Sequence, residues 1–323
     1  MESSKGDFSE SFSYGGYDTD SPMITASVTK LFTTTCVLKL CEQRRLSLED
    51  KISQYFSRNL LSGLHVFKGH EYSFDLTVSD LLFQTSGLPD EFESSNNAGI
   101  LKKAILDGDT YITFEQYLAE VKLLAPRFAP NTEKKAYYSN INFDLLGEIL
   151  EKVAEMSLAD LYRQLIFTPL GMTNTYLPVD EKDFVPQVYY KSQSLERPKL
   201  IASCRASGGC VSTAKDLMTF SKAFWDGSLF DKKIFERLCV YRKLQINKGP
   251  IFYGGGYMQI PLGVPLTLFM GKGELLGHSG STGSFAFYYP VKDLHFTGDM
   301  LQLAKPDIPI KLIMRLAMTC NKR

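Results

Sequence analysis

The sequence predicts an α+β fold in which an inserted all-helical lobe interrupts a lobe built around a sheet. Strand-like segments occur near both ends of the chain, over residues 7–20 and in Gly-punctuated apolar runs from Phe252 onward. Between them, apolar residues recur at the spacing typical of amphipathic helices. We expect residues 1–50 and 205–323 to form the α/β lobe and residues 51–204 the helical lobe, with the active site in the cleft between them.

The first long element is predicted to be a buried helix over residues 27–44, because apolar side chains cover most of its circumference. It follows a predicted strand and turn over residues 7–20. Thr77 or Ser79 can cap a helix that ends near Gly87. Residues 178–205 are expected to be irregular, and further helices are predicted at residues 113–125, 142–156, 157–172, 212–224 and 309–318.

Composition excludes several classes of protein. The 323 residues include 36 basic and 36 acidic side chains, and this zero net charge argues against nucleic-acid binding. No run approaches the roughly 18 apolar residues of a membrane span, and the first residues contain no apolar signal segment. A cytoplasmic protein that binds neither nucleic acid nor membrane is therefore predicted.

Cysteine and histidine usage gives no sign of a cofactor. The six cysteines contain no C-x-x-C pair, which favours reduced thiols. The four histidines show no H-x-H or H-x-x-x-H spacing, so neither a metal nor another cofactor is expected. The sequence makes no prediction of the oligomeric state.

The motif S-x-x-K occurs twice, at Ser27 to Lys30 and at Ser212 to Lys215. A serine hydroxyl needs a base to become a nucleophile, and burial at a helix start lowers the pKa of a lysine enough to make it one. Only the first copy opens a helix that is apolar nearly all round. The ordinary interpretation, a capping serine with a solvated lysine, suits the second copy, where Ser212 or Thr213 would cap an amphipathic helix with Lys215 on its polar side, next to Asp216.

Two further groups of residues could take part in catalysis. Tyr138 and Asn140 are two positions apart, so an extended segment would point both the same way. The tyrosine could relay a proton, or it could be a core residue beside a capping asparagine. His278 and Gly280 precede a predicted strand, where a glycine would let a substrate approach backbone N–H groups. The alternative there is a Gly-rich hairpin with a surface histidine.

The order of these motifs resembles the serine β-lactamase and penicillin-binding-protein superfamily, nearest the class C β-lactamase-like branch with its family VIII type carboxylesterases. Seven segments are similar to family segments in the family's order: ASVTKLFTT, LSLEDKISQYF, LTVSDLLFQTSGLPD, YYSNINFDLLGEILEKV, IFTPLGMTNTYL, ASGGCVSTAKDL and GHSGSTGSFAFYYP. The resemblance implies an antiparallel sheet flanked by helices, with an all-helical lobe beside it. It also selects Ser27 over Ser212.

The same resemblance implies a role for each site residue. Ser27 would be the acylated nucleophile, Lys30 its base or proton relay, and Tyr138 the group that activates Ser27 and later the deacylating water. Asn140 would hold Lys30 and the substrate carbonyl group. His278 would line the site where many relatives carry lysine. The backbone N–H groups of Ser27 and Ser281 would bind the oxyanion, with Gly280 beside them.

The chain departs from the family pattern without losing a catalytic group. Only 26 residues precede Ser27, so the N-terminal elements of the family are expected to be missing or shortened. Gln84 stands where the family usually has histidine, Asn131 where it has glycine, and Leu301 where it often has asparagine.

Together these observations predict a serine hydrolase that works through an acyl-enzyme, most simply a carboxylesterase on short-chain neutral esters. The rival enzymes are a β-lactamase, a D,D-peptidase and a D-aminopeptidase, whose substrates are small amides. The rival from another class is a non-catalytic binding relative, which the intact set of four catalytic-type residues argues against.

Overall fold

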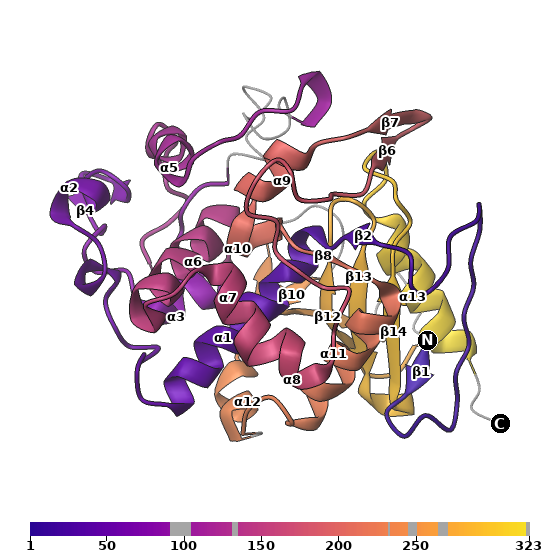
Figure 1. Cartoon of the computed structure of the whole chain (residues 1–323). Coiled ribbons are helices and arrows are strands. Elements are labelled where there is room, and N and C mark those ends of the chain that lie inside the picture. Colours follow the sequence, from indigo (N-terminus) through magenta and orange to yellow (C-terminus); the bar gives the residue numbers. More distant parts are fainter. Residues whose placement is uncertain (91–104, 131–134, 232, 245–250, 264–270, 321–323) are drawn as a thin grey trace.

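The computed structural model describes residues 1–90, 105–130, 135–231, 233–244, 251–263 and 271–320. Within them a central sheet carries helices on both faces and a group of helices beside it (Figure 1). The sheet has eight strands, which in spatial order are β1 (Glu2–Ser3), β14 (Leu294–Gly298), β13 (Phe285–Tyr289), β12 (Glu274–Ser279), β11 (Met258–Pro261), β10 (Phe252–Tyr253), β9 (Arg242–Leu244) and β5 (Lys135–Ala136). Every neighbouring pair is antiparallel except β5 with β9. The predicted antiparallel sheet is therefore confirmed.

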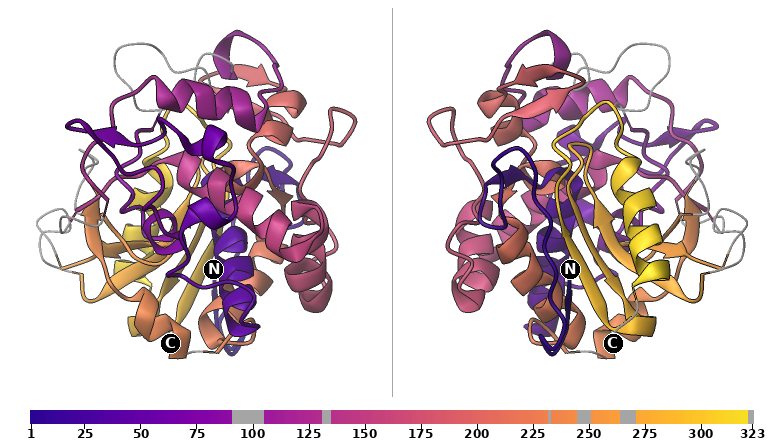
Figure 2. Two further views of the ribbon diagram at one scale, coloured as in Figure 1. Left: turned by 90° about the vertical axis from the view of Figure 1, so that its left-hand side faces the viewer. Right: turned by 90° about the vertical axis from the view of Figure 1, so that its right-hand side faces the viewer.

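Helices cover the two faces of this sheet (Figure 2). On one face lie α1 (Thr29–Glu42) and α11 (Ala214–Asp226), and on the other lies α13 (Ile308–Thr319). The helices beside the sheet are α3 (Val78–Leu82), α5 (Phe114–Lys122), α6 (Asn140–Ala154), α7 (Leu158–Tyr162), α8 (Thr168–Leu170), α9 (Pro198–Ser203) and α10 (Arg205–Gly208), with a π-turn, η3 (Arg163–Phe167), between α7 and α8.

The remaining elements are short. They are the strand pairs β2 (Met23–Ile24) with β8 (Val211–Ser212), β3 (Val66–Phe67) with β4 (His70–Glu71) and β6 (Val188–Tyr190) with β7 (Gln193–Leu195), the helices α2 (Arg58–Leu61) and α12 (Lys233–Leu238), and the 3₁₀ turns η1 (Ala26–Val28), η2 (Ile52–Gln54) and η5 (Pro290–Lys292).

Helix α1 runs through the core, with every side chain from Thr29 to Leu38 buried. The hydroxyls of Thr33, Thr34 and Thr35 stay satisfied there because they donate to backbone carbonyls, as Thr34 Oγ1 does to Lys30 O at 2.7 Å. The predicted buried helix is thus confirmed. It begins differently, because the 3₁₀ turn η1 precedes the first α-helical residue.

Three sequence predictions about local structure were wrong. Residues 7–20 form no strand beyond an isolated bridge at Ser9, because residues 9–20 are exposed and face no second element that would bury them. Residues 178–205, expected to be irregular, contain the β6–β7 hairpin, α9 and the start of α10. Asp216, expected on a polar surface, is buried and accepts hydrogen bonds from Asn174 N and Thr175 Oγ1. Asn131 and the predicted strand over residues 265–271 fall on positions outside the described residues, apart from Gly271.

Candidate active site

Ser27 lies in the turn η1, at the point where the chain enters the core. Ala26 before it has a φ of 43°, a left-handed conformation that costs energy for a residue with a Cβ atom. The turn is held from several sides: Thr25 N donates to Cys210 O at 2.9 Å, and Ser284 Oγ donates to Thr25 O at 2.6 Å. The serine is therefore presented by a strained and firmly anchored backbone.

Lys30 is wholly buried, and each hydrogen of its ammonium has an acceptor. Nζ lies 2.6 Å from the backbone oxygen of Ser207, 2.8 Å from Asn140 Oδ1 and 3.3 Å from Ser27 Oγ. The first two acceptors are carbonyl oxygens, which cannot donate. When the amine is neutral, its two hydrogens can stay on these oxygens while its lone pair faces Ser27 Oγ. This geometry suits a base that removes the serine proton.

The electrostatic surroundings bring the Lys30 pKa close to neutrality. Burial lowers the pKa to about 8, and the nearby Asp144, Asp90 and Cys204 oppose this shift. A lysine with its ordinary pKa would be almost fully protonated at pH 8. Here a large fraction is neutral at that pH, so the buried amine can act as a base under mildly alkaline conditions.

Asp90 orients the amide of Asn140, and the sequence analysis missed it. Asn140 is the first residue of α6, after the N-cap Ser139. Its backbone N and its Nδ2 approach Asp90 Oδ1 at 3.3 and 3.4 Å. Because the carboxylate attracts the NH₂ group, Oδ1 of the amide is turned toward Lys30. The segment SGLPD around Asp90 gave a signal for a helix end but none for this contact.

The ring of Tyr138 packs beside the amine of Lys30. Lys30 Nζ lies 5.1 Å from the ring centroid, within cation–π range. The ring also packs edge-on against Tyr253, with centroids 6.0 Å apart, and against His278 at 5.9 Å. The predicted site residues Ser27, Lys30, Tyr138 and Asn140 are thus brought together from elements far apart in the sequence.

His278 lies deeper than the sequence analysis expected. Its side chain has no exposed surface, so it does not line an open site. Nδ1 lies 2.9 Å from Ser279 O, which can only accept, so Nδ1 carries the hydrogen and Nε2 accepts from Tyr253 Oη at 3.4 Å. Burial, and secondarily the charge of Lys30, lowers the His278 pKa to about 3. The imidazole is neutral because the rings of Tyr138 and Tyr253 exclude water from it.

Gly280 allows the end of β12 to touch the serine turn. A Cβ atom at this position would lie 2.7 Å from Thr25 O and 2.8 Å from Ala26 Cβ. The glycine was predicted to let a substrate approach the backbone, and the neighbouring backbone also requires a residue without a Cβ atom here. The close approach places the half-buried Ser281, in the turn after β12, near the segment that holds Ser27.

The second S-x-x-K motif forms no comparable site. Ser212 is buried in β8, where its Oγ lies 2.8 Å from Thr175 Oγ1. Lys215 has a side chain that is 66% exposed and pairs with Asp20 at 3.1 Å. Thr213 caps α11 by accepting from the backbone N of Asp216. Ser212 therefore lies inside the protein, whereas Lys215 extends into solvent.

Other features of the described residues bear on chemistry. All six cysteines are free thiols. Within the described ranges, no group of three or more His, Cys, Asp or Glu side chains could hold a metal ion. In the same ranges, no helix combines the length and apolar character needed to cross a bilayer.

Comparisons with known proteins agree with this architecture. The Beta-lactamase family model matches residues 7–298. A D-stereospecific amidohydrolase from Streptomyces sp. superposes with a TM-score of 0.74 over 96% of this chain and 90% of its own, with 24% identical residues. EstCE1, described as a hydrolase with promiscuous acyltransferase activity, gives a TM-score of 0.73 over 94% of this chain and 86% of its own, at 19% identity.

A curated relative is similar in sequence over part of its length. The D-alanyl-D-alanine-carboxypeptidase/endopeptidase AmpH of Escherichia coli (strain K12) is 28% identical over 233 residues, which are 71% of this chain. The matched region spans 56% of that relative's length.

Proposed function

Because the chain belongs to the Beta-lactamase family, we propose that it is a serine hydrolase that acts through an acyl-enzyme on Ser27. The observation that carries the proposal is the buried amine of Lys30, whose Nζ lies 3.3 Å from Ser27 Oγ while two carbonyl oxygens take its other hydrogens. A serine and a base within hydrogen-bond reach, with the base oriented by a third group, is the arrangement that nucleophilic catalysis requires.

The proposed reaction proceeds in two halves. Ser27 Oγ forms a bond to the substrate carbonyl carbon, and its proton moves to Lys30 Nζ. The bond to the leaving oxygen then breaks, and that oxygen takes the proton from Lys30. In the second half water forms a bond to the acyl carbon, and Tyr138 assists in removing the water's proton. The bond between the acyl carbon and Ser27 Oγ then breaks, Oγ takes up that proton, and the acid is released. The backbone N–H groups of Ser27 and Ser281 are proposed to stabilise the oxyanion, as such donors do in acyl transfer.

The proposed site lies between the two predicted lobes. Ser27 and Lys30 come from the lobe of residues 1–50 and 205–323, while Tyr138 and Asn140 come from residues 51–204. Asn140 would hold both Lys30 and the substrate carbonyl group.

We propose short-chain neutral esters as the substrates. His278, at the position where many relatives carry lysine, is neutral and buried, so it brings no positive charge for a substrate carboxylate. Hydrogen bonds to charged groups contribute roughly 1.5–3 kcal/mol against roughly 0.5–1.5 for neutral ones, so losing this cation costs anionic substrates about tenfold in binding.

The matched variants S27A and S212A test the nucleophile. The unmodified protein and S212A should each react with a fluorophosphonate and carry the adduct on the peptide that contains Ser27, whereas S27A should not be labelled. An adduct on Ser212, or full activity in S27A, would show that the nucleophile is misassigned.

A substrate panel tests the ester class separately. We expect a higher kcat/KM for p-nitrophenyl butyrate than for nitrocefin or a D-phenylalanine anilide. A clear preference for nitrocefin would assign a β-lactamase, and a preference for the anilide would assign an amidase or peptidase, with Ser27 still the nucleophile.

A further inference from the structure

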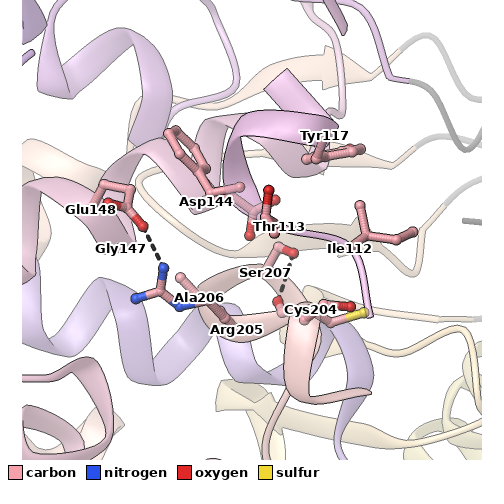
Figure 3. Close-up of a pocket in the computed structure, with 12 residues that line it drawn as sticks. Ile112, Thr113, Tyr117, Asp144, Gly147, Glu148, Cys204, Arg205, Ala206 and Ser207 are labelled. Carbon is pink, nitrogen blue, oxygen red and sulfur yellow. Dashed lines mark hydrogen bonds and ion pairs between the residues drawn. The ribbon is translucent and has the colours of Figure 1, made fainter. Parts of the chain in front are cut away.

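We propose that Asp144, which lines a pocket shared with the Lys30 partner Ser207, is a positioning residue whose negative charge sets the pH at which Lys30 can accept the serine proton. The inference rests on the proposed role of Lys30 as the base. It starts from a pocket that the sequence analysis did not anticipate, formed where α5, α6 and α10 meet (Figure 3).

The pocket reaches the lysine through a shared residue. Ser207 lines it, and the backbone oxygen of the same residue accepts a hydrogen bond from Lys30 Nζ at 2.6 Å. Asp144 lines the same pocket and lies one helical turn after Asn140, whose Oδ1 binds Nζ. Figure 3 shows Asp144, Ser207 and Thr113 gathered around one space. Two of the three partners of Lys30 Nζ, Ser207 O and Asn140 Oδ1, therefore come from residues that line this pocket or lie one helical turn from Asp144.

The pocket exists because α6 and α10 approach closely beside it. A Cβ atom at Gly147 would lie 2.6 Å from Ala206 Cβ. Because Gly147 has no Cβ atom, α10 can pack closely here, and its backbone, with the Ser207 carbonyl, lies against the face of α6 that carries Asp144. The position of the carboxylate behind Lys30 thus follows from the helix packing.

Among the described residues no lysine or arginine forms an ion pair with Asp144, although the charges of Lys30 and Arg205 both act on it. Its Oδ1 is buried and lacks a hydrogen-bond partner there, although the side chain as a whole keeps some exposed surface. Arg205 is instead paired with Glu148 and lies 2.5 Å from Glu151. The carboxylate can therefore act on the charge of Lys30 through a medium that screens charge poorly.

The charged and titratable groups around the pair come from several elements. The pKa of Lys30 is raised by the charges of Asp144 on α6, of Asp90 in the segment after α3, and of Cys204 between α9 and α10. His278 on β12 faces Lys30 but is neutral. Asp144 itself feels Lys30, Arg205 and hydrogen bonds from Ser207, and its burial raises its pKa to about 7. Lys30 and Asp144 therefore titrate as a coupled pair close to neutral pH.

The isosteric variant D144N separates this role from a structural one. Removing the negative charge disfavours the ammonium form, so the Lys30 pKa should fall by roughly one pH unit. The neutral amine is the active form, so the acidic limb of kcat/KM for p-nitrophenyl butyrate should move to lower pH by the same amount. At a pH one unit below the original inflection, D144N should be several-fold more active than the unmodified protein. Damage to the fold would lower activity at every pH.

The matched control is E148Q. Glu148 lines the same pocket one turn further along α6, but its charge is engaged by Arg205 and it is not among the groups that act on Lys30. E148Q should leave the inflection where it is. An equal shift in both variants would indicate a general loss of negative charge and would contradict the specific role of Asp144.

A second readout keeps the test independent of turnover. The Lys30 pKa can be read from the ¹³Cε resonance of labelled lysine, assigned by its loss in K30R. If this pKa falls in D144N while no ester is hydrolysed, the coupling stands and the proposed function fails. If esters are hydrolysed and the pKa stays unchanged in D144N, the coupling is wrong. Should D144N fail to fold, D144S removes the same charge with a smaller side chain and is judged by the same shift.

Discussion

The two copies of S-x-x-K show how far the surroundings decide what a motif does. Lys30 has no exposed surface and donates to two carbonyl oxygens, whereas Lys215 is mostly in solvent and pairs with Asp20. The serines differ as well: Ser27 lies beside the amine of Lys30, whereas Ser212 is hydrogen-bonded to Thr175. Identical spacing thus gives a coupled pair in one place and two unrelated side chains in the other.

The difference originates in the way each helix begins. At α11 the side chain of Thr213 accepts from the N–H of Asp216, the usual way to satisfy a helix start. At α1 no side chain caps the first turn, and a 3₁₀ turn with a left-handed Ala26 leads into it. Ser27 therefore keeps its hydroxyl for Lys30.

The largest expected effect is on the two serines. S27A removes the proposed nucleophile, so kcat/KM for p-nitrophenyl butyrate should fall by at least about 10³-fold. S212A should keep its kcat/KM within about twofold and lose about 1 kcal/mol of unfolding free energy, because Thr175 loses a buried partner. Steady-state kinetics and urea denaturation of both variants check this contrast, which would collapse if S212A were the inactive one.

The lysines should differ in the same direction by a smaller factor. K30A removes the base and should lower kcat/KM at least about 10²-fold, the usual scale for general acid–base groups. We expect a comparable loss for Y138F. K215A breaks an exposed ion pair and should change neither activity nor stability measurably. Rates at saturating and at limiting substrate give kcat and kcat/KM for both variants. A K215A enzyme as impaired as K30A would contradict the predicted difference between the two lysines.

The pH profile should report the buried lysine. The Lys30 pKa is lowered to about 8 and the neutral amine is the proposed active form, so activity should rise with pH between about 7 and 9, with its inflection near 8, and stay high on the alkaline side. His278, with a pKa near 3, is neutral throughout this range and supplies no inflection. A profile whose single inflection lay near 6.5 and vanished in H278A would make His278 the base instead.

The sequence predicted those parts of the molecule that depend on local pattern. The buried helix and the late Gly-bounded strands were predicted because periodicity and turn residues are local properties. The partner at Ser207 could not be found, because it is a backbone oxygen 177 residues from Lys30, and a carbonyl leaves no mark on the residue type. Burial of His278 depends on two tyrosine rings that packing alone brings to it.

The acidic residues around Lys30 illustrate the same limit. Asp144 lies within a correctly predicted amphipathic helix, yet on the sequence it is simply another polar position of that helix. Its importance arises from the neighbouring α10, whose approach at Gly147 was invisible to a helical pattern. Asp90 belongs to the family-like segment LTVSDLLFQTSGLPD, but on the sequence this part of the segment indicated only the end of a helix. Electrostatic partners of a buried group thus need the tertiary structure.

The smallest effect on activity is expected from T213A, which isolates the helix cap at the second motif. Thr213 accepts a hydrogen bond from Asp216 N at 3.1 Å, and losing such a cap costs about 1 kcal/mol. Since α11 packs against β13 and β14, on the far side of the sheet order from Tyr253, the loss should appear in unfolding free energy while kcat/KM stays unchanged. Urea denaturation paired with ester hydrolysis measures both quantities on one sample. If T213A lost activity and its Ser27 reacted correspondingly more slowly with a fluorophosphonate, the two motifs would be coupled through β8, which pairs with the strand just before Ser27. The two motifs could then no longer be treated as independent.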